Sequence, residues 1–341
     1  KDVGISSKIR EIATPIEGGL SEHAAKELGL LEGTHVGIGV IDAHAGGIGV
    51  LGTNFSQSCK AISESDLRNR IALIAGTSSC HMYAADAAPF MEGVWGPYYS
   101  AMIPGMWLME AGQNAAGSVI EHVIKSHPAH EALVKLGATK ISTAFEILNE
   151  RIAALSKKTF PAKLTQHVHV LADFHGNRAP LADPHIQGSI VGLTLDDSID
   201  NLAVLYLATI QSLAYGTRRI ISYISENTER NSGKPAKIDT IFLTGGLAKN
   251  PLFVSQHAEI TNCRIVLPKT DAVLLGSAIV AAVASGFHKN MFEAMACMSS
   301  YAAIVEPSKD IQVVRYHEKK YNVFLQMYDH QLLYRNCMNE E

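Results

Sequence analysis

The sequence lacks the patterns that assign many proteins quickly to a class. Its five cysteines among 341 residues are odd in number and widely spaced, without a C-x-x-C pair. That spacing argues against a disulfide framework and favours free thiols in a reducing compartment, so we expect a cytoplasmic protein. The formal net charge is −4 and no long basic run is present, which gives no electrostatic footprint for nucleic acid.

Long apolar runs are also missing. The longest, Ala272–Phe287, is interrupted by Gly276, Ser277 and Ser285. It falls short of the roughly 20 residues that a bilayer requires, so it predicts a buried helix and no membrane span. No G-x-x-x-x-G-K-[ST] motif is present, which excludes a P-loop, and the D-F-H-G tetrapeptide is not accompanied by the H-R-D loop of protein kinases.

Strand-like and helix-like segments alternate along the chain, and its length suits two domains, so the sequence predicts an α/β architecture. A hairpin is expected over Arg70–Ala85, and a strand over 240–244 runs into a helix that starts at Asn250-Pro251. Helical spacing of apolar residues predicts further helices over 142–158, over 196–226 and from about Gln312 to the end.

Two loops between these elements are candidates for binding an anion. In the first, Gly76 is followed by the hydroxyls of Thr77, Ser78 and Ser79, which can present donors to a phosphate. An ordinary hairpin turn explains the same residues. In the second, Gly245-Gly246 lies between a strand and a helix, where a ligand can approach the backbone closely. A tight connection without a ligand remains the alternative.

Asp42 is a candidate for catalysis. It ends the apolar run from Val36, so we expect it at the exit of a buried strand, with Gly46, Gly47 and Gly49 clearing space around it. A carboxylate in such a place could accept a proton from a substrate hydroxyl. A turn-forming or helix-capping role is the structural alternative, and the spacing alone does not decide between them.

A metal site is the competing interpretation. His167 and His169 would point to one face of a strand, with Asp173 close behind, as the ligands of a metal-dependent hydrolase could. With 15 histidines in the chain, such a pair also arises by chance.

Together, the motifs GVIDAHAGGIG, IAGTSSCHM, DFHGNRAPLADP, FLTGGLAKNPLFVSQHAEI and LLGSAIVAAVASG resemble the FGGY family of carbohydrate kinases, and most of all its ribulokinase branch. The resemblance implies an actin/hexokinase-like (ribonuclease H-like) ATPase fold and transfer of phosphate from ATP, with Mg²⁺, to an open-chain sugar. It implies Asp42 as the general base. It implies phosphate binding by Gly76, Thr77 and Ser78, and adenosine binding by Gly245, Gly246 and Asn250.

The implied substrate is D-ribulose, converted to D-ribulose 5-phosphate, with xylulose, L-ribulose or ribitol as alternatives. The family's first phosphate loop, D-x-G-T/S, is imitated by DVGISS at Asp2–Ser7, but this stretch lacks flanking apolar strands and lies only 40 residues before Asp42. We therefore expect residues 1–64 to be the remnant of a first domain, 65–310 a complete second domain and 311–341 a C-terminal helix. Such a chain would be truncated and poorly active, or a non-catalytic binding module. The sequence gives no indication of its oligomeric state.

Overall fold

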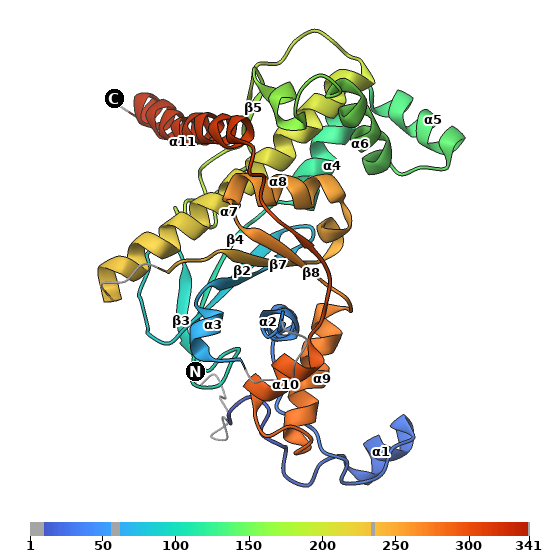
Figure 1. Cartoon of the computed structure of the whole chain (residues 1–341), viewed down its shortest axis with the longest axis vertical. Helices are drawn as coiled ribbons and strands as arrows, with labels where there is room; N and C mark the ends of the chain where they lie inside the picture. The colour runs from blue at the N-terminus through green and yellow to red at the C-terminus, as the bar shows by residue number, and fades with distance from the viewer. Residues whose placement is uncertain (1–9, 56–61, 233–235, 340–341) are drawn as a thin grey trace.

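The computed structural model describes residues 10–55, 62–232 and 236–339, so the DVGISS stretch lies outside the described residues. At its centre is a sheet of seven strands in the order β3-β4-β2-β1-β7-β8-β9 (Figure 1). The strands are β1 Arg70–Ala75, β2 Ser79–Ala85, β3 Trp95–Tyr99, β4 Trp107–Gln113, β7 Thr240–Thr244, β8 Arg264–Pro268 and β9 Tyr301–Val305. A separate pair joins β5 His169–Leu171 to β6 Ser189–Val191.

The sheet is mixed, with an antiparallel part and a parallel part. Strands β1, β2, β4 and β3 form antiparallel pairs, β1, β7 and β8 run parallel, and β9 returns antiparallel to β8. The predicted hairpin over Arg70–Ala85 and the predicted strand over 240–244 are both confirmed. Parallel strands need covered faces, which explains why β1 reads as a continuous apolar run.

Helices cover both faces of the sheet. On one side lie α4 Gly117–Ser126, α6 Ala144–Leu155, α7 Ile199–Ser232 and α8 Pro251–Thr261; on the other lie α2 Asp42–Leu51, α9 Ala272–Ala284 and α10 Met291–Met298 (Figure 1). Alternate residues of β1 enter the two cores, Ile71 and Leu73 on the first side and Ala72 on the second. The α/β sandwich is therefore one sheet between two helical layers.

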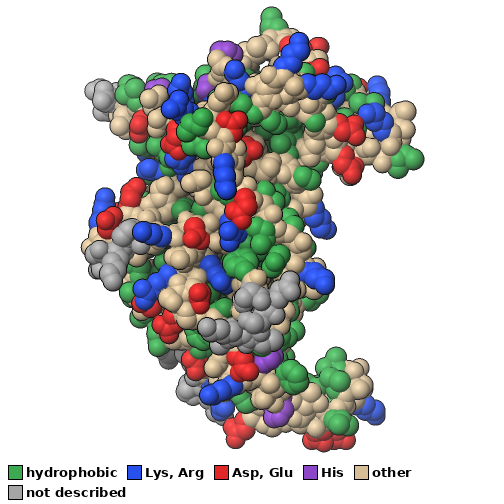
Figure 2. Space-filling model, in the orientation of Figure 1, with side chains coloured by type: hydrophobic (Ala, Val, Ile, Leu, Met, Phe, Trp, Pro, Cys, Tyr) green, Lys and Arg blue, Asp and Glu red, His purple; other side chains and the backbone are tan. Residues whose placement is uncertain are grey.

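The remaining helices and turns complete the fold. They are α1 Glu22–Leu28, α3 Glu64–Leu67, α5 His130–Lys140, α11 Ile311–Asn339 and the 3₁₀ turns η1 Pro161–Thr165 and η2 Gly246–Lys249. Helix α1 projects from one end of the molecule, and acidic and basic side chains are interspersed over the face shown in Figure 2. Within the described ranges, no helix is long and apolar enough to cross a membrane.

The expectation that Asp42 leaves a buried strand is wrong. Residues 38–41 form no strand, Gly37 makes only an isolated bridge to Pro15, and Asp42 is the first residue of α2. The apolar spacing of Val36–Ile41 suits an extended segment, but the glycines that follow lie in a helix buried from His44 to Leu51. This helix shares one core with the sheet.

The glycines of α2 also have a different purpose from the one expected. A Cβ atom on Gly49 would lie 2.1 Å from the Ala272 carbonyl oxygen, and one on Gly276 would lie 1.8 Å from the Ala45 carbonyl oxygen. The small residues therefore let α2 and α9 approach backbone to backbone, and they do not clear space around Asp42. The predicted helix at α9 is confirmed but only partly buried, since Leu274 is 72% exposed.

Substituting Gly276 by Ala tests this contact. The added methyl group forces α2 and α9 apart, so we expect the free energy of unfolding to fall by about 1–3 kcal/mol. Denaturant unfolding would measure the change. Gly39→Ala is the matched control, because a Cβ there meets nothing within 4 Å and should change stability by no more than about 0.5 kcal/mol. Equal effects of the two substitutions would contradict the close packing.

Two histidines are buried together between β2, α7 and α8. His81 and His257 both face the Thr217 hydroxyl, at 3.0 and 3.4 Å from their Nε2 atoms. The His81 Nδ1 atom has no hydrogen-bond partner among the residues that the structure describes. Burial lowers the pKa of His81 to about 3 and that of His257 to about 4. Both rings are therefore neutral in the folded protein at neutral pH.

These lowered pKa values predict that acid weakens the fold. Below pH 6.5 the unfolded chain binds protons at both histidines and the folded chain does not, so their stabilisation is complete above pH 6.5 and is lost as pH falls toward 4. By pH 5 each ring should cost roughly 2 kcal/mol. His81→Gln should flatten the slope of unfolding free energy between pH 5 and 6.5, whereas the exposed His23→Gln should not. An unchanged slope in His81→Gln would refute this explanation.

Candidate active site

The two predicted glycine turns lie side by side because their strands are paired. Strands β1 and β7 are parallel, with Ile74 opposite Thr244, so Gly76 and Gly245 follow at the same edge of the sheet. Gly245 has φ of +96°, and a Cβ on it would lie 2.4 Å from the Ala75 carbonyl oxygen. Only glycine permits this backbone conformation and this approach.

A cavity of about 650 Å³ opens at these turns. It is lined by Gly76, Thr77, Gly117, Ser118, Glu121, Ile124, Lys125, His130, Ala144, Phe145, Gly246 and Leu247. A Cβ built on Gly76 or Gly246 meets nothing within 4 Å, so the backbone of both faces open space. The structure therefore brings Gly76, Thr77 and Gly246 to one cavity, with Ser78 and Gly245 next to them in the chain.

The first turn is held by the start of α4. The backbone N–H groups of Ala116 and Ser118 donate to the Thr77 carbonyl at 2.8 and 3.2 Å, and that of Gly117 donates to the Gly76 carbonyl at 2.9 Å. A Cβ on Gly117 would lie 2.7 Å from the Gly76 carbonyl oxygen. Sequence reasoning missed Gly117 as a site residue; its one visible signal is that a glycine opens helix α4.

The cavity wall is apolar away from the glycine turns. Ile124, Ala144, Phe145 and Leu247 form this part. The charged groups stand at the rim, where Lys125 Nζ lies 2.5 Å from Glu121 Oε1 and both side chains are exposed. Such a cavity can hold a flat apolar group against Phe145 and a polar group against the open backbone of the glycine turns.

Asn250 lies behind this cavity and is not among its lining residues. It is buried and caps α8, and its Oδ1 atom accepts hydrogen bonds from the Leu252 N–H at 3.1 Å and from Asn149 Nδ2 at 3.0 Å. Its Nδ2 donates to the Tyr206 hydroxyl at 2.7 Å, and the Tyr206 ring stacks on Phe145 of the cavity wall. The side chain is thus committed within the protein, and it acts on the cavity through Tyr206.

Asp42 stands at the same edge of the sheet, on the opposite face. Gly46, one turn further along α2, would place its Cβ 3.5 Å from Ile74, which pairs with Cys80 across the hairpin. Arg70 at the start of β1 donates to the carbonyl of Leu51, the last residue of α2, at 2.6 Å, so α2 runs antiparallel to β1 and its first residue, Asp42, lies toward the end of that strand. The Asp42 side chain is exposed, and its Oδ1 accepts from the Ala43 N–H at 2.7 Å.

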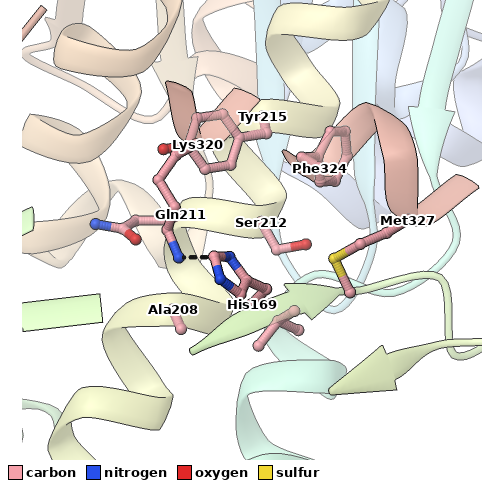
Figure 3. A pocket seen from close by; sticks show the side chains of 9 residues that line it. His169, Ala208, Gln211, Ser212, Tyr215, Lys320, Phe324 and Met327 are labelled. Carbon is pink, nitrogen blue, oxygen red and sulfur yellow. Dashed lines mark hydrogen bonds between the residues drawn. The ribbon is translucent and has the colours of Figure 1, made fainter. Parts of the chain in front are cut away.

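The alternative metal site is wrong. Within residues 10–55, 62–232 and 236–339, no three His, Cys, Asp or Glu side chains gather as a metal site would require, so His167, His169 and Asp173 form no ligand set. His169 lines a cavity of only about 10 Å³, where its Nδ1 lies 3.1 Å from Lys320 Nζ (Figure 3). Burial and the Lys320 charge lower the pKa of His169 to about 4. Asp173 is held elsewhere, by Asn177 Nδ2 at 3.0 Å.

Comparison with known proteins shows the family to which this chain belongs. Residues 71–285 match the C-terminal domain of the FGGY family of carbohydrate kinases. The chain belongs to this family. It is 44% identical over 337 residues to the FGGY carbohydrate kinase domain-containing protein of Xenopus laevis, covering 98% of this chain and 60% of that relative. It is 34% identical over 279 residues to a D-ribulokinase of Saccharomyces cerevisiae, covering 78% and 38%.

Solved structures of sugar kinases share the fold. A ligand-bound xylulose kinase from Lactobacillus acidophilus matches with a TM-score of 0.69 at 21% identity, over 95% of this chain and 57% of that one. A glycerol kinase from Plasmodium falciparum with ADP matches with a TM-score of 0.64 at 14% identity, over 94% and 55%. The actin/hexokinase-like fold expected from the motifs is confirmed, and the chain spans about 60% of the length of the first relatives that it matches.

Replacing Asn250 by Ala tests its role behind the cavity. The change removes the cap of α8 and the acceptor of the Asn149 Nδ2 group, and it leaves the Tyr206 hydroxyl with only its bond to Asn149 Oδ1. We expect the free energy of unfolding to fall by about 1–3 kcal/mol, measured by denaturant unfolding. The exposed cap of α1, Ser21, is the matched control, and Ser21→Ala should cost about 0.5–1 kcal/mol. Unchanged stability in Asn250→Ala would show that these buried hydrogen bonds do not stabilise the fold.

Proposed function

We propose that this chain carries the nucleotide site and the general base of an ATP-dependent pentulose kinase, acting on D-ribulose to give D-ribulose 5-phosphate. One observation carries the proposal: the turns at Gly76-Thr77 and Gly246 meet at one cavity, and Asp42 stands at the same edge of the sheet. The relatives named D-ribulokinase and ribulokinase support the choice of sugar. Kinases for xylulose, L-ribulose or ribitol are the alternatives.

ATP would lie along the cavity. The adenine ring would occupy the apolar wall near Phe145 and Leu247, and the phosphates would reach the turns at Gly76 and Gly246. Backbone N–H groups near strand ends suit this task because they offer fixed dipoles to phosphate oxygens. In this arrangement Thr77 and Ser78 assist the phosphate, and Gly245 and Asn250 shape the second turn. These roles are proposals.

Asp42 would act as the base. Its exposed carboxylate would take the proton of the sugar C5 hydroxyl as that oxygen attacks the γ-phosphorus, and the bond to the β–γ bridging oxygen breaks to release ADP. General-base assistance contributes about 10²–10⁴-fold to such a reaction. Because the cavity and Asp42 lie on opposite faces of the sheet, the γ-phosphate must pass the strand ends to reach the sugar.

Mg²⁺ would enter with the nucleotide as Mg-ATP. No trio of candidate ligand side chains exists among the described residues, so phosphate oxygens and water would supply most of its ligands. Magnesium in phosphoryl-transfer sites commonly keeps such a ligand set, with one or two carboxylates. A magnesium ion bound in this way neutralises charge on the phosphates.

The domain limits at residues 64 and 310 and the poor activity expected of 341 residues alone remain predictions. The first test is therefore direct: ATP binding by calorimetry, followed by ADP release with D-ribulose, xylulose, L-ribulose and ribitol at fixed ATP. Binding together with turnover that is fastest on D-ribulose supports the proposal. Nucleotide binding without turnover of any sugar would contradict a kinase and favour a binding module.

Asp42→Asn is the decisive substitution. We expect ADP release with sugar to fall by about 10²–10⁴-fold, because the amide cannot take the hydroxyl proton, while the affinity for ATP stays within about twofold. Asp66→Asn on α3 is a control carboxylate remote from the cavity lining. Retained turnover in Asp42→Asn would remove Asp42 from the role of base.

A further inference from the structure

The DFHGNRAPLADP motif has no part in the site so far. Its residues 173–184 form a loop, here called the NRAP loop, that is fixed to the C-terminal helix. Asn177 Nδ2 donates to the Tyr328 hydroxyl at 3.2 Å and to Asp173 at 3.0 Å, and Arg335 Nη1 lies 2.7 Å from Asp183 Oδ2. Loop and α11 are therefore one anchored unit.

Arg178 extends from this loop to the edge of the sheet where Asp42 stands. Its Nη2 donates to Glu110 Oε1 of β4 at 2.8 Å, and its guanidinium carbon lies 4.4 Å from the centre of the Trp95 ring. Its Nη1 lies 3.5 Å from the Cys80 sulfur. At Gly112 a Cβ would come within 3.2 Å of the same Nη1, so this glycine leaves room for the guanidinium.

Glu110 also contacts helix α2. Its second oxygen lies 3.7 Å from His44 Nε2, and His44 Nδ1 lies 3.1 Å from the Ala101 carbonyl oxygen. His44 belongs to the first turn of α2, two residues after Asp42. A continuous line of contacts thus joins the NRAP loop to the turn that carries the proposed base.

The three side chains that form this line of contacts are largely buried, which limits their movement. The side chains of Arg178, Glu110 and His44 are 17%, 14% and 7% exposed. The nearby His44 ring is the main reason why the pKa of Glu110 is held below its usual value, and the Arg178 charge adds to it. Removing one partner of such a pair leaves the other charge poorly solvated, so the remaining groups must rearrange.

We propose that Arg178 is a positioning residue for Asp42: through Glu110 and His44 it fixes the first turn of α2 at the strand ends. The effect on catalysis rests on the proposed kinase function, whereas the effect on α2 does not. Because a misplacement of about 1 Å can cost about 10²-fold in rate, a small shift of this turn is enough to matter.

The experiment compares Arg178→Met with Arg335→Met. Arg335→Met breaks the other ion pair of the NRAP loop without touching Glu110, so it reports loosening of the loop alone. We expect Arg178→Met to lower kcat by about 10- to 100-fold, with the affinity for ATP within twofold of the parent. Arg335→Met should change kcat by less than about threefold.

Amide hydrogen exchange of the same variants reports on the first turn of α2 and does not depend on catalytic turnover. Amides of residues 43–47 should exchange at least tenfold faster in Arg178→Met and Glu110→Gln than in the parent or in Arg335→Met. If the parent binds ATP but turns over no sugar, the kinase proposal fails, and faster exchange still upholds the link from Arg178 to α2. Exchange at parent rates in Arg178→Met would overturn the inference whatever the turnover.

Two further variants separate positioning from general loss of structure. Arg178→Lys keeps a cation near Glu110 but loses the guanidinium stacked on Trp95, so it should recover only part of the kcat that Arg178→Met loses. Adding Arg178→Met to Glu110→Gln should lower kcat by less than threefold more, because both changes break the same link. Fully multiplied effects of the two substitutions would show that Arg178 does not act through Glu110.

Discussion

The parallel pairing of β1 with β7 is the constraint on which the rest of the site depends. Because the two strands are in register up to Ile74 and Thr244, their glycine turns emerge together, and the carbonyl of Ala75 lies against the backbone of Gly245. A shift of one residue would bury the wrong side chains on both faces of the sheet, since each face is covered. Hydrogen bonding and core packing of this strand pair therefore set the position of the cavity.

The two helical layers contribute different parts of the candidate site. The layer with α4 closes the cavity and holds the Gly76-Thr77 turn, and the layer with α2 presents Asp42 on the other face. Close contact between α2 and α9 fixes the height of α2 above the sheet, because the backbones touch at Gly49 and Gly276. The glycines of α2, which the sequence suggests leave space around Asp42, therefore hold the helix that carries Asp42 in a defined position.

Buried polar groups connect distant parts of the chain to this edge. The NRAP loop contacts both α11 and β4, and Glu110 of β4 contacts α2 in turn, although α11 is the last element of the sequence. Tyr206 and Asn250 similarly join α7 and α8 behind the cavity wall. Such groups are costly to leave unpaired, so each of these networks favours a single arrangement of the elements around it.

The sequence by itself determined the elements whose signals are local. The hairpin over Arg70–Ala85, the strand at Thr240–Thr244, the Asn250-Pro251 helix start and the C-terminal helix follow from periodicity, turn residues and capping, and its motifs indicated the family. Only the tertiary structure decided that Asp42 begins a helix, that the nearby glycines serve helix packing, that Gly117 lines the cavity and that Arg178 contacts Glu110. Those features depend on contacts between residues far apart in the chain, and single-sequence spacing carries no record of them.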